Sequence, residues 1–168
     1  MLVKRIVCTV EPHQRRSFHK AQMEWSALRT IEGFIAQFGG WDTVDPSTAY
    51  LYSFWENRDR YEDFMENTHD KIFGQSNQGA TYTSINVELF EGTARPTEID
   101  ERLRHGVFIK ADVINCAQRP LTNERSDETL LFSDATERIL LFTDPDTAGE
   151  TGESFMVIED WRVHRNDQ

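Results

Sequence analysis

Hydrophobic and polar positions alternate with a period of two in four short stretches of the first ninety residues. This period is typical of β-strands that bury at least one face. In the first stretch Leu2 and Ile6 fall on one side, while Val3 falls on the other, so both faces carry apolar residues. The predicted strands span residues 2–10, 33–40, 49–56 and 81–90.

Two stretches between these strands repeat apolar residues at three- and four-residue spacing, which predicts amphipathic helices. Pro12 falls in the first turn of the first helix, where its missing N–H costs no hydrogen bond. Asn57 is a suitable N-cap for the second helix, and Gly74 is a suitable residue to end it. The helices are expected at residues 11–30 and 57–74.

The resulting order, βαββαβ, predicts an α+β fold of the ferredoxin-like type, with two helices on one face of an antiparallel sheet. The opposite face is also apolar, because it carries Val3, Val7 and an aromatic third strand. An apolar face of this size is expected to be covered. Either a second copy of the protein or the C-terminal half of the chain can supply the cover, and the sequence leaves both open.

The remaining residues predict a second, β-rich region. Residues 1–92 form the ferredoxin-like domain, the polar segment 93–105 is expected to be a linker, and residues 106–168 form the extension. The extension is either a truncated second βαββ unit, with residues 123–136 as its short helix, or an unrelated β addition. Its strands are expected at residues 107–116, 138–143 and 153–163, with residues 144–152 as a hairpin loop.

Composition narrows the classes of partner. The 168 residues carry a formal net charge of −11 and no long basic run, which argues against nucleic acid and anionic membranes as partners. No apolar run approaches the roughly 20 residues of a membrane helix, and we expect a cytoplasmic protein. The five histidines lack metal-binding spacing, and nucleotide-binding motifs are missing, so no metal and no cofactor are expected.

Three motifs give the first half a family likeness: Gly-Gly-Trp at residues 39–41, Phe-Trp-Glu-Asn at 54–57, and the aromatic-rich run at 64–73. They resemble the YdbC-like group within the antibiotic-biosynthesis-monooxygenase-like proteins of the dimeric α/β-barrel superfamily. The resemblance covers residues 1–90. It implies a homodimer, with a pocket for a small molecule between helices and sheet in each protomer. Relatives include cofactor-free oxygenases of aromatic polyketides, haem-degrading enzymes, small isomerases and proteins without catalysis.

Aromatic residues are the candidates for contact with the ligand. Trp55 stands where relatives keep a pocket tryptophan, and it either stacks on a planar ligand or anchors the second helix. Trp25 is either core or pocket wall, and Trp41 is either pocket rim or dimer contact. The residues available as polar pocket residues are Tyr52, Tyr61, Gln37 and Asn86.

His69 is the candidate general base, because a neutral imidazole can accept a proton near neutral pH. The alternative is a histidine at the border of the helix, favoured by the helix dipole. His19 on the first helix is expected to face it across the cleft. The sequence thus predicts an enzyme similar to cofactor-independent monooxygenases, acting on a planar aromatic or enolisable compound. The competing hypothesis is a non-catalytic binding or regulatory dimer of the same fold.

Overall fold

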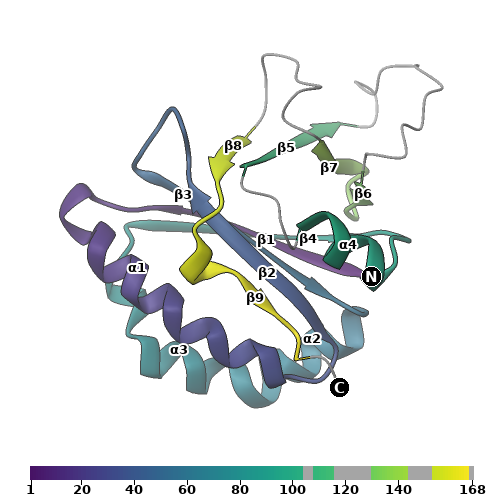
Figure 1. The fold of residues 1–168 in the computed structure, drawn as a ribbon, viewed down its shortest axis with the longest axis horizontal. Helices are drawn as coiled ribbons and strands as arrows, with labels where there is room; N and C mark the ends of the chain where they lie inside the picture. Colours follow the sequence, from purple (N-terminus) through teal and green to yellow (C-terminus); the bar gives the residue numbers. More distant parts are fainter. Residues whose placement is uncertain (104–107, 116–129, 144–152, 167–168) are drawn as a thin grey trace.

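The computed structural model describes residues 1–103, 108–115, 130–143 and 153–166, and the fold is given for these residues. They form one antiparallel sheet of nine strands in the order β8-β5-β7-β6-β4-β1-β3-β2-β9, which curls round on itself (Figure 1). The strands are β1 (Leu2–Thr9), β2 (Phe34–Trp41), β3 (Thr48–Trp55), β4 (Ser84–Glu91), β5 (Phe108–Asn115), β6 (Leu130–Ser133), β7 (Arg138–Thr143), β8 (Glu153–Met156) and β9 (Val163–His164).

The first half confirms the predicted ferredoxin-like order. Strand β1 lies between β3 and β4, with β2 beyond β3, and the helices cover one face of these four strands (Figure 1). The first helical segment consists of η1 (Pro12–Gln14), α1 (Arg15–Met23) and η2 (Glu24–Thr30). The second consists of α2 (Arg58–Phe64), η3 (Met65–His69) and α3 (Asp70–Ser76), followed by η4 (Gln78–Ala80).

The ends of the second helical segment test two sequence predictions. Asn57 is its N-cap as predicted, since its side-chain oxygen accepts a hydrogen bond from the Arg60 backbone N–H at 2.9 Å. Gly74 does not end the segment, which continues to Ser76. Asn77 takes the terminating left-handed conformation instead, with φ of 52°. Asparagine tolerates this conformation better than most residues.

The second half repeats the strand order of the first. Strands β8-β5-β7-β6 follow one another as β4-β1-β3-β2 do, if β5 is matched to β1. The predicted pairing of β7 with β8 is wrong, because both strands flank β5. The hairpin joins β6 to β7 around residues 134–137, and β6 occupies part of the segment expected to be a helix. The rest of that segment, 123–129, and the expected loop 144–152 lie outside the described residues.

Two further segments differ from the expected secondary structure. Residues 96–103 of the expected linker form α4 (Pro96–Leu103). The long final strand expected at 153–163 is divided into β8, the short helix η7 (Glu159–Trp161) and β9. No helix in the described part of the chain is long and apolar enough to cross a membrane.

The two halves meet at both edges. Glu91 of β4 pairs with Ser133 of β6, and Asp42 after β2 pairs with Phe155 of β8. The second junction explains Gly40, the second glycine of the Gly-Gly pair in the sequence motif. A Cβ on Gly40 would lie 2.0 Å from the Met156 carbonyl oxygen, so only glycine permits this approach of the two backbones.

The face of the first sheet that points away from the helices is covered by the chain's own second half. One apolar cluster joins side chains of β1–β4 to those of α4 and β5–β8. Its fully buried members include Val3, Phe38, Phe54, Phe132 and Phe155. The C-terminal half therefore supplies the cover for which the sequence left two sources open.

Candidate functional site

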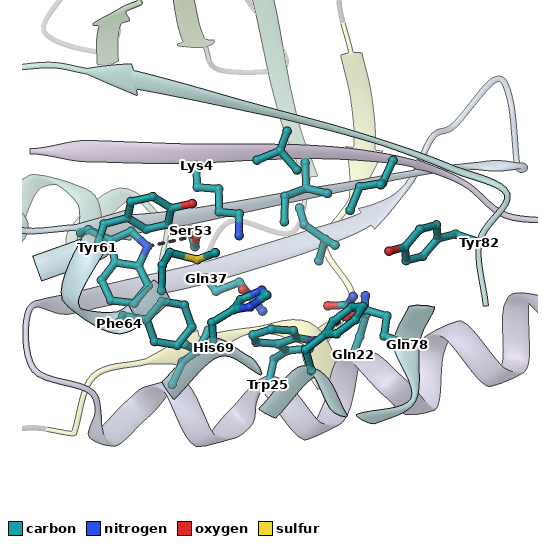
Figure 2. Close-up of a pocket in the computed structure, with 18 residues that line it drawn as sticks. Lys4, Gln22, Trp25, Gln37, Ser53, Tyr61, Phe64, His69, Gln78 and Tyr82 are labelled. Atoms are coloured by element: carbon teal, nitrogen blue, oxygen red, sulfur yellow. Dashed lines mark hydrogen bonds between the residues drawn. The ribbon is translucent and has the colours of Figure 1, made fainter. Parts of the chain in front are cut away.

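A cavity of about 270 Å³ lies between the helices and the other face of the first sheet (Figure 2). Strands β1, β3 and β2 form its floor, and η2, α2, η3 and α3 form its walls. Exposed Ile85 and Val87 of β4 border it, at 46% and 45% exposure. The lining is mostly apolar, as is usual for pockets that bind small organic molecules.

Aromatic side chains make most of the wall. The His69 ring lies 5.6 Å from the Trp25 ring and 5.8 Å from the Phe64 ring, measured between centroids. It stacks on Phe73 at 5.7 Å with an interplanar angle of 12°. The Trp25 indole N–H donates to the Gln78 side-chain oxygen at 2.6 Å, which fixes the plane of the indole.

His69 reaches the cavity because the helix changes its pitch. Residues Met65–His69 form a π-helical segment between α2 and α3. A π-segment inserts an extra residue into the helix, and such segments occur often at functional sites. The lining residues are therefore Tyr61, Met65, His69 and Phe73, whereas an uninterrupted helix would present Thr68 and Ile72.

The ring of His69 has one nitrogen engaged. Its Nδ1 lies 2.9 Å from an Asp70 carboxylate oxygen, which can only accept a hydrogen bond. This contact places the proton of the neutral ring on Nδ1 and leaves Nε2 as the proton acceptor. Asp70 is almost fully exposed, so water competes for this contact.

Three polar side chains cross the floor in one row. Lys4 of β1 is paired with Ser53 of β3, which is paired with Gln37 of β2. All three line the cavity, and their exposures are 9%, 6% and 6%. Burial lowers the pKa of Lys4 from 10.5 to about 8. Figure 2 shows the Lys4 amine directed into the cavity, towards the side occupied by His69 and Gln37.

Comparison with known proteins gives the family. Residues 2–90, more than half of the chain, match the family described as a domain of unknown function (DUF4937). The chain belongs to this family. The YdbC protein of Bacillus subtilis (strain 168), an uncharacterised protein, is 47% identical over 93 residues, which cover 54% of this chain and 78% of YdbC.

Three solved structures are similar in fold to this DUF4937 protein over nearly its whole length. A candidate monooxygenase of Fusobacterium nucleatum has a TM-score of 0.66 at 13% identity, covering 97% of this chain and 94% of its own. Another, from Lactobacillus acidophilus NCFM, has a TM-score of 0.62 at 10% identity, covering 98% and 96%. An anthrone oxidase-like protein has a TM-score of 0.60 at 11% identity, covering 99% and 94%. At these identities the likeness shows the fold alone.

Four of the seven predicted site residues line the cavity of the DUF4937 protein: His69, Trp25, Tyr61 and Trp55. Trp55 is 1% exposed, stacks on Phe64 at 4.8 Å, and donates its indole N–H to Ser53 at 3.2 Å. It therefore lines the cavity and also anchors the helix. Burial raises the pKa of the Tyr61 hydroxyl.

The other three predicted residues lie elsewhere. Tyr52 is on the opposite face of the sheet, because neighbours along a strand alternate and Ser53 faces the cavity; its hydroxyl donates to Glu153. His19 and Trp41 are both in ring contact with Trp161, away from the cavity. Trp161 donates to His19 Nδ1 at 3.0 Å, so His19 does not face His69 as expected.

Sequence reasoning missed Lys4 and Ser53. Lys4 gave a usable signal, since it falls between Leu2 and Ile6 on the face of β1 predicted to be buried. Gln37, which the sequence offered as a polar pocket residue, lines the cavity, whereas Asn86 is not among the lining residues. No group of three or more His, Cys, Asp or Glu residues that could hold a metal ion occurs in the described part of the chain.

Proposed function

We propose that this protein is a cofactor-independent oxygenase acting on a planar aromatic or enolisable compound in the helix–sheet cavity. The observation that carries the proposal is the aromatic-walled cavity of about 270 Å³ with the His69 ring inside it. A non-catalytic scaffold would be expected to fill this space with Phe18, Trp25 and Phe64. Phe18 instead packs on Trp41 and Trp161, while Trp25 and Phe64 stand at the wall of an open cavity.

The chemistry begins with a proton transfer. His69 Nε2 accepts a proton from the substrate, and the substrate becomes an electron-rich enolate or phenolate. The enolate gives one electron to dioxygen, and the resulting radical and superoxide combine to form a carbon–oxygen bond. The peroxide anion takes back the proton held by His69.

The second half of the reaction balances the atoms. Loss of the remaining proton from the same carbon breaks the oxygen–oxygen bond and releases water. A methylene carbon has then become a carbonyl carbon, with one oxygen atom in the product and the other in water. The substrate supplies all four electrons, and the protein supplies a base, a planar binding surface and a site largely free of water.

The solved structures support this class of reaction by analogy of fold. Two of the full-length neighbours are candidate monooxygenases, and a third is described as anthrone oxidase-like. Anthrone has the required chemistry, being a planar compound with an acidic methylene group. It is therefore the first substrate to test.

The experiment measures oxygen uptake and quinone absorbance with anthrone, each corrected for the reaction without protein. The His69→Gln variant should lose activity by about 10²- to 10⁴-fold, the usual contribution of a general base. His13→Gln is the matched control, because His13 is exposed and lies outside the cavity. Unchanged uptake in His69→Gln would remove His69 as the base.

A second pair of variants tests whether the reaction uses the cavity. Val87→Trp should block the entrance and reduce activity, whereas Val44→Trp should not, because Val44 is 88% exposed and outside the cavity. Anthrone is one member of the proposed class, so a panel of hydroxyanthracenes and naphthols follows it. Saturable binding of the panel without any oxygen uptake would establish the non-catalytic alternative.

The predicted homodimer stays a proposal. The apolar face that suggested it is covered within the chain, so a second copy would have to bind another surface. Light scattering gives the mass in solution, and the 19.6 kDa chain would appear near twice that mass as a dimer.

A further inference from the structure

We propose that Lys4, Ser53 and Gln37 form an oxyanion-binding subsite, and that the ligand is a planar aromatic compound with a negatively charged oxygen on its edge. This inference rests on the proposed function in placing the ligand in the same cavity, and it adds the charge of the ligand and the residues that recognise it. The negative oxygen is either a carboxylate that the ligand brings or a phenolate or enolate formed in the site.

The row of hydrogen-bond donors is the first support. Cross-strand neighbours lie about 5 Å apart, so the three side chains follow one another across the floor. Lys4 brings an ammonium group and Gln37 an amide NH₂. The Ser53 oxygen accepts from Trp55, which leaves its own proton to donate. The neighbouring row holds Leu2, Trp55 and Phe34, so the donors are concentrated at one level of an apolar floor.

An unused donor in the row is the second support. Gln37 is 6% exposed, and its Nε2 has no hydrogen-bond partner among the described residues. A buried amide donor without a partner costs about 1 to 3 kcal/mol. Such groups are uncommon in folded proteins, and a ligand oxygen in the cavity would satisfy this one.

The charge of the cavity is the third support. The protein carries 29 acidic residues, yet no carboxylate lines the cavity in the described part of the chain. Lys4 makes a cation–π contact with the Tyr61 ring, whose centroid lies 5.6 Å from Nζ. No described residue forms an ion pair with Lys4. A buried ammonium is stabilised by an opposite charge, and here the ligand can provide it.

The test uses 2-naphthoate, a permanent anion, and naphthalene-2-carboxamide, its neutral counterpart of nearly the same shape. Binding is followed by quenching of the fluorescence of Trp25 and Trp55, which line the cavity. Lys4→Met should weaken binding of naphthoate by about 10- to 100-fold, the usual effect of losing a charge-assisted hydrogen bond. Binding of the carboxamide should change by less than about threefold. Lys71→Met, at an exposed position, is the matched control.

A third probe, 2-naphthol, separates the two sources of the negative oxygen. A site that forms phenolates should show the red-shifted absorbance of bound naphtholate at a pH where free naphthol is neutral, and Lys4→Met should abolish it. A site for carboxylates alone should bind naphthoate without this signal. The naphtholate absorbance or the binding of naphthoate, if lost in Lys4→Met, supports the subsite.

The wild-type protein gives a measurement that does not depend on the folding of a variant. Its affinity for naphthoate should fall as the pH rises through about 8, where the free Lys4 amine loses its proton. Affinity for the carboxamide should stay constant. His69 of η3, Tyr61 of α2 and Tyr82 before β4 are the other titratable groups of the cavity, and β2, β3, α1 and η2 contribute none. A His69→Gln variant measured in parallel isolates the part due to His69.

Three results would overturn the subsite: equal affinity of the wild type for both probes, no binding of naphthoate, or an equal loss of both probes in Lys4→Met. The proposed oxygenase activity and the proposed subsite can be refuted independently of each other. Binding of naphthoate through Lys4, together with no oxygen uptake on anthrone or on the panel of hydroxyanthracenes and naphthols, would remove the oxygenase and keep the subsite. Oxygen uptake that Lys4→Met leaves unchanged would do the reverse.

Discussion

Replacing Lys4 by methionine should make the free protein more stable at neutral pH, although it weakens ligand binding. Burial lowers the pKa of Lys4 from 10.5 to about 8, so the folded protein holds the ammonium less favourably than the unfolded chain does. At 1.36 kcal/mol for each pKa unit, this difference amounts to about 3 kcal/mol. Methionine has a similar length and no charge, so the variant should recover most of that free energy.

The gain should depend on pH in a defined direction. Between pH 8 and 10.5 the unfolded chain keeps the Lys4 proton while the folded protein has lost it. The unfolded state then binds more protons, so the stability contributed by Lys4 rises with pH in this window. The advantage of Lys4→Met should therefore be greatest below pH 8 and nearly vanish by pH 10.5. Burial raises the pKa of Cys8 to about 12, which lowers stability at high pH in both proteins and cancels in their difference.

The assay is urea unfolding of the wild type and the variant at pH 7, 8.5 and 10, with Lys71→Met as the control. The expected differences in the free energy of unfolding are about 3 kcal/mol at pH 7 and below about 1 kcal/mol at pH 10. Two results would refute the reasoning. One is a variant less stable than the wild type at pH 7, and the other is a stabilisation that does not change with pH.

Three other substitutions test the fold. Asn57→Ala should cost about 1 kcal/mol of unfolding free energy through loss of the helix cap, whereas Asn57→Asp should keep it. Arg5→Met should cost about 3 kcal/mol or more, because it removes the cation that joins Glu88 to Glu153 between the two halves of the chain. Trp161→Phe should cost about 2 kcal/mol, because it removes a partly buried hydrogen bond and leaves a void beside a buried ring. Each is measured by urea unfolding, and losses below about 0.5 kcal/mol, typical of surface substitutions, would contradict the assigned contacts.

The helices and strands of the first half were predictable because each one is indicated by residues close together in the sequence. Alternation in β1 and the cap at Asn57 are local signals, and both are found in the structure. Part of the pairing in the second half is not local, since β7 and β8 both pair with β5 and not with each other. Adjacent strands in sequence usually pair, and that general tendency misled the prediction.

The helix α4 was missed for a different reason. Pro96 lies in the polar segment expected to be a linker, yet proline is also favoured in the first turn of a helix. The Arg95 backbone N–H donates to the Glu98 carboxylate at 2.9 Å, half of a capping box. Ile99 is fully buried in the interior cluster and holds the helix against the sheet. This tertiary contact, together with the proline and the cap, makes the segment a helix instead of a polar linker.

Most of the walls of the candidate site were predictable, but of the polar residues in its floor only Gln37 was. Trp55 and His69 stand out in the sequence as an aromatic residue and a titratable one. The π-segment that turns His69 inwards depends on packing and has no clear pattern in the sequence. Lys4, Ser53 and Gln37 are 49 and 16 residues apart along the chain, and only the strand register brings them into one row.

The two cations of β1, Lys4 and Arg5, show that the charge of the cavity cannot be inferred from the acidic composition of the chain. Lys4 and Arg5 are adjacent in sequence, so they point to opposite faces of the same sheet. Arg5 lies in the interior between the two halves, where Glu88 and Glu153 both pair with it. Lys4 is 9% exposed on the other face, and no described carboxylate approaches it. The chain has 29 acidic residues, and two of them pair with Arg5. The lack of a carboxylate at Lys4 is therefore not due to a shortage of acidic residues. Arg5 links the two halves of the fold, and Lys4 is the cation that we propose to bind the ligand.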